Sequence, residues 1–133
     1  MSYVDKVNEI LEEYKRSLDI NHDVKIKLRR YKTKSAFVNL KTMTIFINEL
    51  LLDLGEEVIR YLVLHELIHL KLNSKYHDSE FNKILYSYIP PEKVSKLREL
   101  ITSKLLLALH TTNKNNIQLG NTESVAIRSL RLT

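Results

Sequence analysis

The spacing of apolar residues along the first third of the chain predicts one helix followed by strands. Residues 2–19 carry apolar side chains at helical spacing with Glu and Lys between them, which predicts an amphipathic helix packed against a core. Residues 24–31 instead alternate, with Val24, Ile26 and Leu28 on one face and basic side chains on the other. This pattern predicts a half-buried strand with a basic outer face. Residues 36–40 and 43–48 predict a hairpin that turns near residues 40–42.

The middle of the chain predicts a buried helix. Residues 56–72 contain no Gly or Pro and are apolar almost all round, so this helix should be central. A short helical turn over residues 49–54 should lead into it. Asp53, followed three residues later by Glu56, resembles a capping box at the helix start.

Two further helices are predicted after this one. Residues 73–75 should end the buried helix, and Asp78 or Ser79 is the expected N-cap of a short helix over residues 79–88. Two prolines stop that helix, and the second can begin a last helix over residues 91–110.

The order of these elements predicts an α+β fold. A helix, three strands and then more helices favour a small, three-stranded, mostly antiparallel sheet with helices packed on one face. Residues 1–110 form the predicted domain, which is large enough for one core. Residues 111–133 read as a polar tail, expected to be disordered or partner-dependent.

Composition narrows the class of protein. A hydrophobic content of 44% with 28% charged residues is ordinary for a globular protein. The absence of Cys excludes disulfides and thiolate metal sites, which fits a reducing, cytoplasmic location. No signal peptide and no apolar run long enough for a membrane span are expected. The sequence does not indicate an oligomeric state.

The net charge of +5 is concentrated in one segment, residues 25–34. Its six basic residues are Lys25, Lys27, Arg29, Arg30, Lys32 and Lys34. Such a strip is one signature of nucleic-acid contact. The favoured interpretation, however, is a solvated strand face in a Lys-rich protein.

The sequence His65-Glu66-Leu67-Ile68-His69 is the HExxH pattern of zinc metalloproteases. Residues four apart lie on one side of a helix, so His65 and His69 can aim at one metal ion. Zinc with three protein ligands keeps a position for water and lowers its pKa, and Glu66 is placed to take the proton of that water. The alternative is a pair of hydrogen-bonded core histidines, which is disfavoured because burying two His and a Glu is costly unless they are engaged.

A third ligand is needed, and three residues compete for the role. His77 lies in the loop after the helix and just before the next helix, from which it can fold back over the site. We therefore favour His77. Glu80 is the rival and Asp78 a weaker candidate. His22 and His110 have no ligand spacing and are expected to be ordinary.

The stretch from Thr44 to Phe81 resembles the small SprT-like and YgjP-like (DUF45) zinc metallopeptidases of the HExxH zincin superfamily. Those proteins have a short strand ending in Asn, a helix carrying His-Glu-Leu-x-His-Leu, and a loop with His and an aromatic residue four positions on. The matching segments here are residues 45–48, residues 65–70, and His77 with Phe81.

The resemblance implies a minimal zincin-like fold in which His65, His69 and His77 bind Zn²⁺ and Glu66 is the catalytic base. The sequence is also similar to the ImmA/IrrE-like peptidases, a second zincin group. In that group the third ligand is an acidic residue on the following helix, which would point to Glu80.

These features predict a zinc metallopeptidase that hydrolyses protein or peptide substrates. By the zincin resemblance, strand 43–48 would be an edge strand that accepts an extended peptide. Tyr76, Tyr86 or Tyr88 could supply an oxyanion donor. The alternatives are a regulatory protease of the ImmA/IrrE kind, or a non-catalytic zincin-fold module that binds protein or nucleic acid, against which the intact Glu66 argues.

Overall fold

A computed structural model of the chain describes residues 2–112 and confirms the predicted α+β class. Its elements are α1 (Tyr3–Ser17), β1 (Lys25–Arg29), β2 (Ala36–Asn39), β3 (Thr44–Asn48), the 3-10 helix η1 (Glu49–Leu54), α2 (Glu56–Leu72), α3 (Ser79–Tyr88) and α4 (Pro91–Thr112). Every helix and strand predicted within these residues is present. The predicted tail begins two residues inside α4, and its remainder lies outside the described residues.

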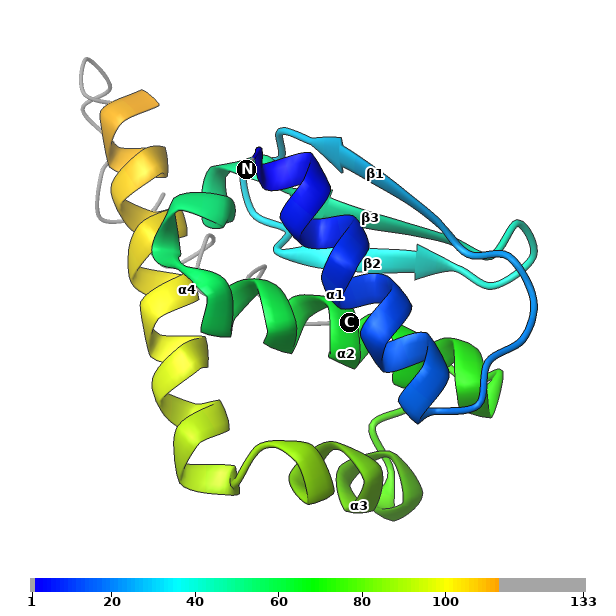
Figure 1. Cartoon of the computed structure of the whole chain (residues 1–133). Helices are drawn as coiled ribbons and strands as arrows, with labels where there is room; N and C mark the ends of the chain where they lie inside the picture. The colour runs from blue at the N-terminus through cyan, green and yellow to red at the C-terminus, as the bar shows by residue number, and fades with distance from the viewer. Residues whose placement is uncertain (1, 113–133) are drawn as a thin grey trace.

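The strand order of the sheet is β1-β3-β2 (Figure 1). β2 pairs antiparallel with β3, as the hairpin predicts, but β1 pairs parallel with β3. The sheet is therefore mixed, and the expectation of a mostly antiparallel sheet is wrong for β1. The chain crosses from β1 to the far edge and returns through the hairpin, so that the apolar strand β3 fills the centre.

This strand order changes which strand is exposed at an edge. β3 has neighbours on both sides, so the prediction that strand 43–48 is a free edge is wrong. The edges are β1 and β2, and β2 is also in contact with α2. The edge strand that contacts α2 is therefore β2 and not β3.

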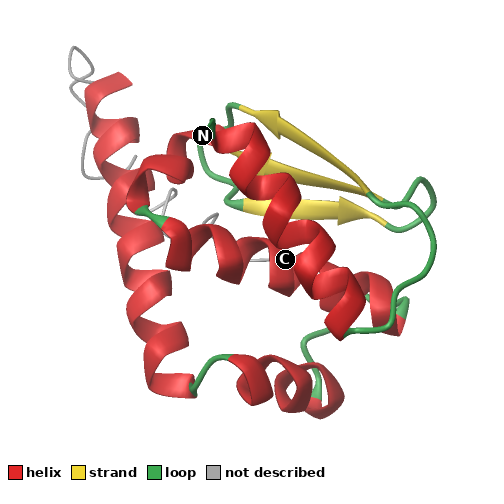
Figure 2. Ribbon diagram, viewed as in Figure 1, coloured by secondary structure: helices red, strands yellow, loops and turns green. Residues whose placement is uncertain are grey.

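The core lies between the sheet and the helices (Figure 2). α1 buries Val7, Ile10, Leu11 and Tyr14 and packs on α2. Twelve of the 17 residues of α2 are buried, as its apolar character predicts. None of the helices that the structure describes is long and apolar enough to cross a membrane.

The start of α2 differs from the prediction. Its N-cap is Gly55, at φ +114°, and no side chain caps the helix, so the capping box at Asp53 and Glu56 is wrong. Asp53 belongs to η1 and forms an ion pair with Lys104 of α4 at 2.9 Å. Glycine suits this turn because it adopts positive φ at low cost.

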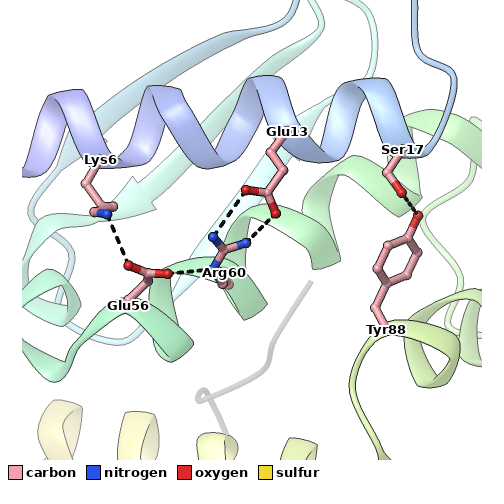
Figure 3. A network of polar contacts seen from close by, with 6 residues as sticks. All are labelled: Lys6, Glu13, Ser17, Glu56, Arg60 and Tyr88. Carbon is pink, nitrogen blue, oxygen red and sulfur yellow. Dashed lines mark hydrogen bonds and ion pairs between the residues drawn. The ribbon is translucent and has the colours of Figure 1, made fainter.

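A polar network joins α1 to α2 across their exposed sides (Figure 3). Arg60 donates to Glu13 at 2.6 Å and to Glu56 at 2.8 Å, and Lys6 lies 3.1 Å from Glu56. The hydrogen bonds from Arg60 lower the pKa of both carboxyls and raise the pKa of Arg60 itself. The network fixes the angle at which α1 supports the buried helix.

Candidate metal centre

The helix α2 carries His65 and His69 one turn apart in its second half, where each is 1% exposed. His77 approaches them from the connection between α2 and α3 and is exposed. One ligand atom from each of the three lies within 4.8 Å of the others. The structure thus brings together the three histidines that the sequence proposes as ligands.

The connection between α2 and α3 positions His77. Asn73 ends α2 in the left-handed conformation (φ 49°), which reverses the chain direction. The side chain of Asp78 then accepts a hydrogen bond from the Phe81 amide at 3.0 Å and begins α3. Of the two predicted N-caps, Asp78 is the one used. These two caps hold the short loop so that His77 turns back toward α2.

The loop also orients His69. Its Nδ1 lies 2.7 Å from the carbonyl oxygen of Ser74, so Nδ1–H donates and Nε2 keeps its lone pair. A backbone acceptor on the second nitrogen is the usual support for a metal-ligating histidine. Sequence reasoning missed this contact, because a carbonyl acceptor carries no side-chain signal.

The spacing of the nitrogens fits a zinc ion. Nε2 of His69 lies 3.0 Å from Nε2 of His77. Two ligands at about 2.05 Å in tetrahedral geometry stand about 3.3 Å apart. Imidazole is also a nitrogen donor that zinc favours. The donor set therefore suits zinc both by type and by the separation of this pair.

Two aromatic rings enclose the histidines. The Phe81 ring lies 4.9 Å from His65, 4.6 Å from His69 and 4.9 Å from His77, measured between centroids. The Tyr61 ring presents an edge to His65 at 5.6 Å, and its hydroxyl accepts from Arg98 at 3.0 Å. Burial raises the pKa of Tyr61, against the effect of Arg98, so Tyr61 stays protonated. Its position one turn before His65 was the sequence signal that could have revealed it.

Glu66 is buried beside the histidines. It is 1% exposed, and its Oε2 lies 3.1 Å from Nδ1 of His65. A buried carboxylate is costly unless it is engaged. Its side chain thus lies at the edge of the three-histidine cluster, in contact with His65.

The other residues considered from the sequence lie elsewhere. Glu80 is exposed in the first turn of α3, and the cluster of candidate ligands among the described residues does not include it. Asp78 is used as a cap. The hydroxyl of Tyr88 shares a hydrogen bond with Ser17 on α1 at 2.5 Å, which ties it to a different part of the molecule (Figure 3). Tyr76 and Tyr86 are exposed.

Comparison with known proteins gives a consistent result. Residues 2–100 match the model of the YgjP-like metallopeptidase domain. An uncharacterized protein of Aquifex aeolicus is 46% identical over 82 residues, which cover 61% of this chain and 74% of that protein. An uncharacterized protein of Methanocaldococcus jannaschii is 35% identical over 103 residues, which cover 77% of this chain and 90% of that protein.

Two solved structures are similar as well. The metallopeptidase zymogen abylysin of Pyrococcus abyssi has a TM-score of 0.69 and 34% identity, covering 74% of this chain and 94% of its own. The metallopeptidase zymogen jannalysin of Methanocaldococcus jannaschii has a TM-score of 0.68 and 32% identity, covering 74% of this chain and 96% of its own.

Proposed function

Since the chain belongs to the family of YgjP-like metallopeptidase domains, we propose that it is a zinc-dependent peptidase whose metal is held by His65, His69 and His77. The observation that carries this proposal is the convergence of these three imidazoles beside a buried glutamate. Family membership by itself supports a metal-dependent peptidase. The choice of zinc rests on the nitrogen donor set.

Glu66 acts as the general base in this proposal. Zinc bound at the histidines would lower the pKa of a water molecule and polarise the scissile carbonyl. Glu66 accepts a proton from the attacking water and returns it to the leaving amine. Its burial places the carboxylate in a low-dielectric environment, which strengthens its electrostatic effect on the reacting groups. His69 is held in the tautomer that offers Nε2 by the Ser74 carbonyl.

The exposed edge of β2 is the proposed docking strand for the substrate backbone. β2 is an edge strand in contact with the helix that carries His65 and Glu66. A peptide that pairs with this edge gains backbone hydrogen bonds that do not depend on its sequence. Tyr76 and Tyr86, both exposed on the α3 side, are the residues we propose to test as oxyanion donors.

The non-catalytic alternative predicts a different use of Glu66. A binding module has no need for a buried carboxylate beside three metal-ligating groups, and in it Glu66 could be exchanged for Gln without effect. The ImmA/IrrE-like alternative requires Glu80 as the third ligand, whereas the cluster of candidate ligands among the described residues contains His77 and not Glu80. These differences make the site testable by substitution.

The experiment combines metal binding with peptide hydrolysis. Zinc content after dialysis is measured for the wild type and for Glu66→Gln, His77→Ala and Glu80→Ala. We expect Glu66→Gln to keep zinc and to lose hydrolysis by about 10²–10⁴-fold. His77→Ala should lose zinc and Glu80→Ala should keep it. Retained hydrolysis in Glu66→Gln would refute the mechanism.

The choice of assay has to allow for latency. The two similar structures are described as zymogens, so we propose that this chain is also made in a latent form. Hydrolysis is therefore measured before and after limited proteolysis of the full chain. Zinc binding does not require activation, which is why it is the first readout.

A further inference from the structure

The outer face of the sheet, which points away from the core, carries a row of one lysine and two aromatic rings. Lys27 of β1, Phe46 of β3 and Phe37 of β2 are aligned by the strand registers. Side chains in register on neighbouring strands share a face. On the opposite face, Ile45 and Ile47 are fully buried in the core. The row therefore faces solvent, while the opposite face of the same sheet packs into the core.

The aromatic part of this face contains three rings in contact. Phe37 and Phe46 are stacked, with centroids 4.7 Å apart and planes at 14°. Tyr31, in the loop after β1, meets Phe37 at 5.4 Å. The ammonium of Lys34 lies 4.7 Å from the Phe37 centroid. All three rings are partly exposed to solvent.

The basic part runs along the edge strand β1. Lys25, Lys27 and Arg29 are exposed and point to the same side, at intervals of about 6.6 Å. Among residues 2–112, Arg30 is the one member of the basic segment with a carboxylate within ion-pair distance, Glu49 at 3.5 Å. Three charges in a line without acidic partners are therefore available to a polyanion.

A hollow continues the charged surface beyond β1. Arg30, Tyr31, Lys32 and Leu50 line it together with the end of α4, and its volume is about 280 Å³. The hollow lies at the end of the strand that Arg29 closes.

From this arrangement we propose that the outer face binds single-stranded nucleic acid. We call the surface formed by Lys25, Lys27, Arg29, Tyr31, Phe37 and Phe46 the basic-aromatic face. Phosphates would lie along β1, and an unpaired base would stack on Phe46, because the Phe37 ring is already in contact with Phe46 and with the Lys34 ammonium. A sheet with exposed rings between basic residues is a general solution for binding unpaired bases. A duplex keeps its bases stacked internally, so it can use the charges but not the rings.

The proposal goes beyond the peptidase function and does not depend on it. The basic-aromatic face lies on the outside of the sheet, whereas His65 and His69 lie on α2, which packs on the inner side, and His77 lies in the connection that follows α2. A variant such as His69→Ala should therefore bind nucleic acid as the wild type does.

The test measures fluorescence anisotropy of a labelled oligothymidylate of about 20 nucleotides with the full chain, between about 50 and 200 mM salt. A triple variant removes the β1 charges, and a matched triple removes the same charge from exposed lysines elsewhere. The two sets are Lys25→Gln with Lys27→Gln and Arg29→Gln, and Lys71→Gln with Lys83→Gln and Lys96→Gln. We expect the first set to lose affinity by about ten- to a hundred-fold and to reduce the slope against log salt by about 2. The matched set should change affinity less than three-fold, by the same reasoning.

A ring variant separates stacking from charge. Phe46→Leu keeps an apolar side chain and should weaken oligothymidylate binding about five-fold or more, because one base–ring stack is lost. The same variant should not change binding of a duplex or of polyglutamate. Circular dichroism and thermal unfolding check that each variant is folded.

Three results would overturn the proposal. The first is no binding of oligothymidylate at the lowest salt concentration. The second is an equal loss of affinity in the β1 triple variant and in the matched triple variant of Lys71, Lys83 and Lys96. The third is a combination of two findings: Phe46→Leu binds oligothymidylate as tightly as the wild type does, and the wild type binds polyglutamate as tightly as oligothymidylate. The face would then be a general site for acidic chains.

Discussion

Asn48 is predicted to be the most sensitive polar residue outside the metal centre. Its side chain is 0% exposed. Its amide nitrogen donates to the carbonyls of Tyr31 and Lys34, each at 2.8 Å, and its oxygen accepts from the amides of Leu50 at 3.1 Å and Tyr31 at 3.4 Å. One side chain thus holds the loop between β1 and β2 and begins η1. The substitution Asn48→Ala leaves these backbone groups without their partner.

The expected loss can be worked from these contacts. Three of the four hydrogen bonds are short, and each contributes about 1 kcal/mol net, so the free energy of unfolding should fall by about 3 kcal/mol. For a domain of this size that corresponds to a melting temperature about 8–12 °C lower. Urea unfolding followed by circular dichroism gives the free energy directly. The measurement is made on metal-free protein, so that zinc binding does not contribute.

Asn39→Ala is the matched control. Asn39 also ends a strand, and its side-chain oxygen also accepts two backbone hydrogen bonds, from Lys41 at 3.0 Å and Thr42 at 3.1 Å. Because Asn39 is exposed, water can replace the lost partner, and the cost should stay below about 1 kcal/mol. Equal losses in the two variants, or a loss below about 1 kcal/mol for Asn48→Ala, would refute the argument that burial decides the cost.

Three further predictions concern the metal, the rings and the pH. Zinc at about a hundred times its Kd should raise the free energy of unfolding of the wild type by about 2.7 kcal/mol. The increase should be much smaller in His77→Ala. Equal increases in the two proteins, measured by calorimetry, would show that His77 is not a ligand. Phe81→Ala should cost about 3–5 kcal/mol, because Phe81 is 1% exposed, and Phe81→Leu should cost clearly less; a chemical denaturation series decides this. Arg60 lowers the pKa of Glu13 and Glu56 from 4.5, so their contribution to stability is fully present above pH 4.5 and is lost as the pH falls through the lowered values. The difference in melting temperature between the wild type and Glu13→Gln should therefore shrink from neutral pH to about pH 3, and a constant difference would contradict it.

The parts of the molecule that could be predicted from the sequence are set by short-range rules. The periods of 3.6 and 2 residues located each helix and strand, because burial of one face requires them. The proximity of His65 and His69 follows from helical spacing alone, and that of His77 from a loop too short to carry it far away. Local preference likewise placed the start of α3 at Asp78 or Ser79, and Asp78 is the cap.

The errors occurred where two parts of the chain compete for one residue. Asp53 has the correct spacing for a capping box, yet Lys104, distant in sequence, forms an ion pair with it. Gly55 then makes the turn into α2 without a side-chain cap. Local preference is worth about 1 kcal/mol at such a position, and a tertiary contact of similar size can override it. The Ser74 carbonyl that orients His69 belongs to the same class, since it depends on the loop path rather than on residue type.

The strand order is the least predictable feature, and it has the largest effect on the proposed function. The alternation of apolar and polar residues shows which face of a strand is buried, but not which strand is its neighbour. The β2–β3 hairpin can therefore be placed with either β2 or β3 next to β1. The apolar character of β3, buried at Ile45 and Ile47 and partly exposed only at Phe46, is the signal for a central strand. With β3 in the centre, the edge close to α2 is β2, and a substrate that pairs there would lie beside the buried helix that carries Glu66. The same order aligns Phe46 and Phe37 with Lys27 on the outer face. One topological choice thus underlies both proposals: β2 offers its edge to a peptide backbone, and the same strand presents Phe37 to the outer face. The charges of β1, on the opposite edge, can therefore be altered by substitution without touching the proposed peptide edge.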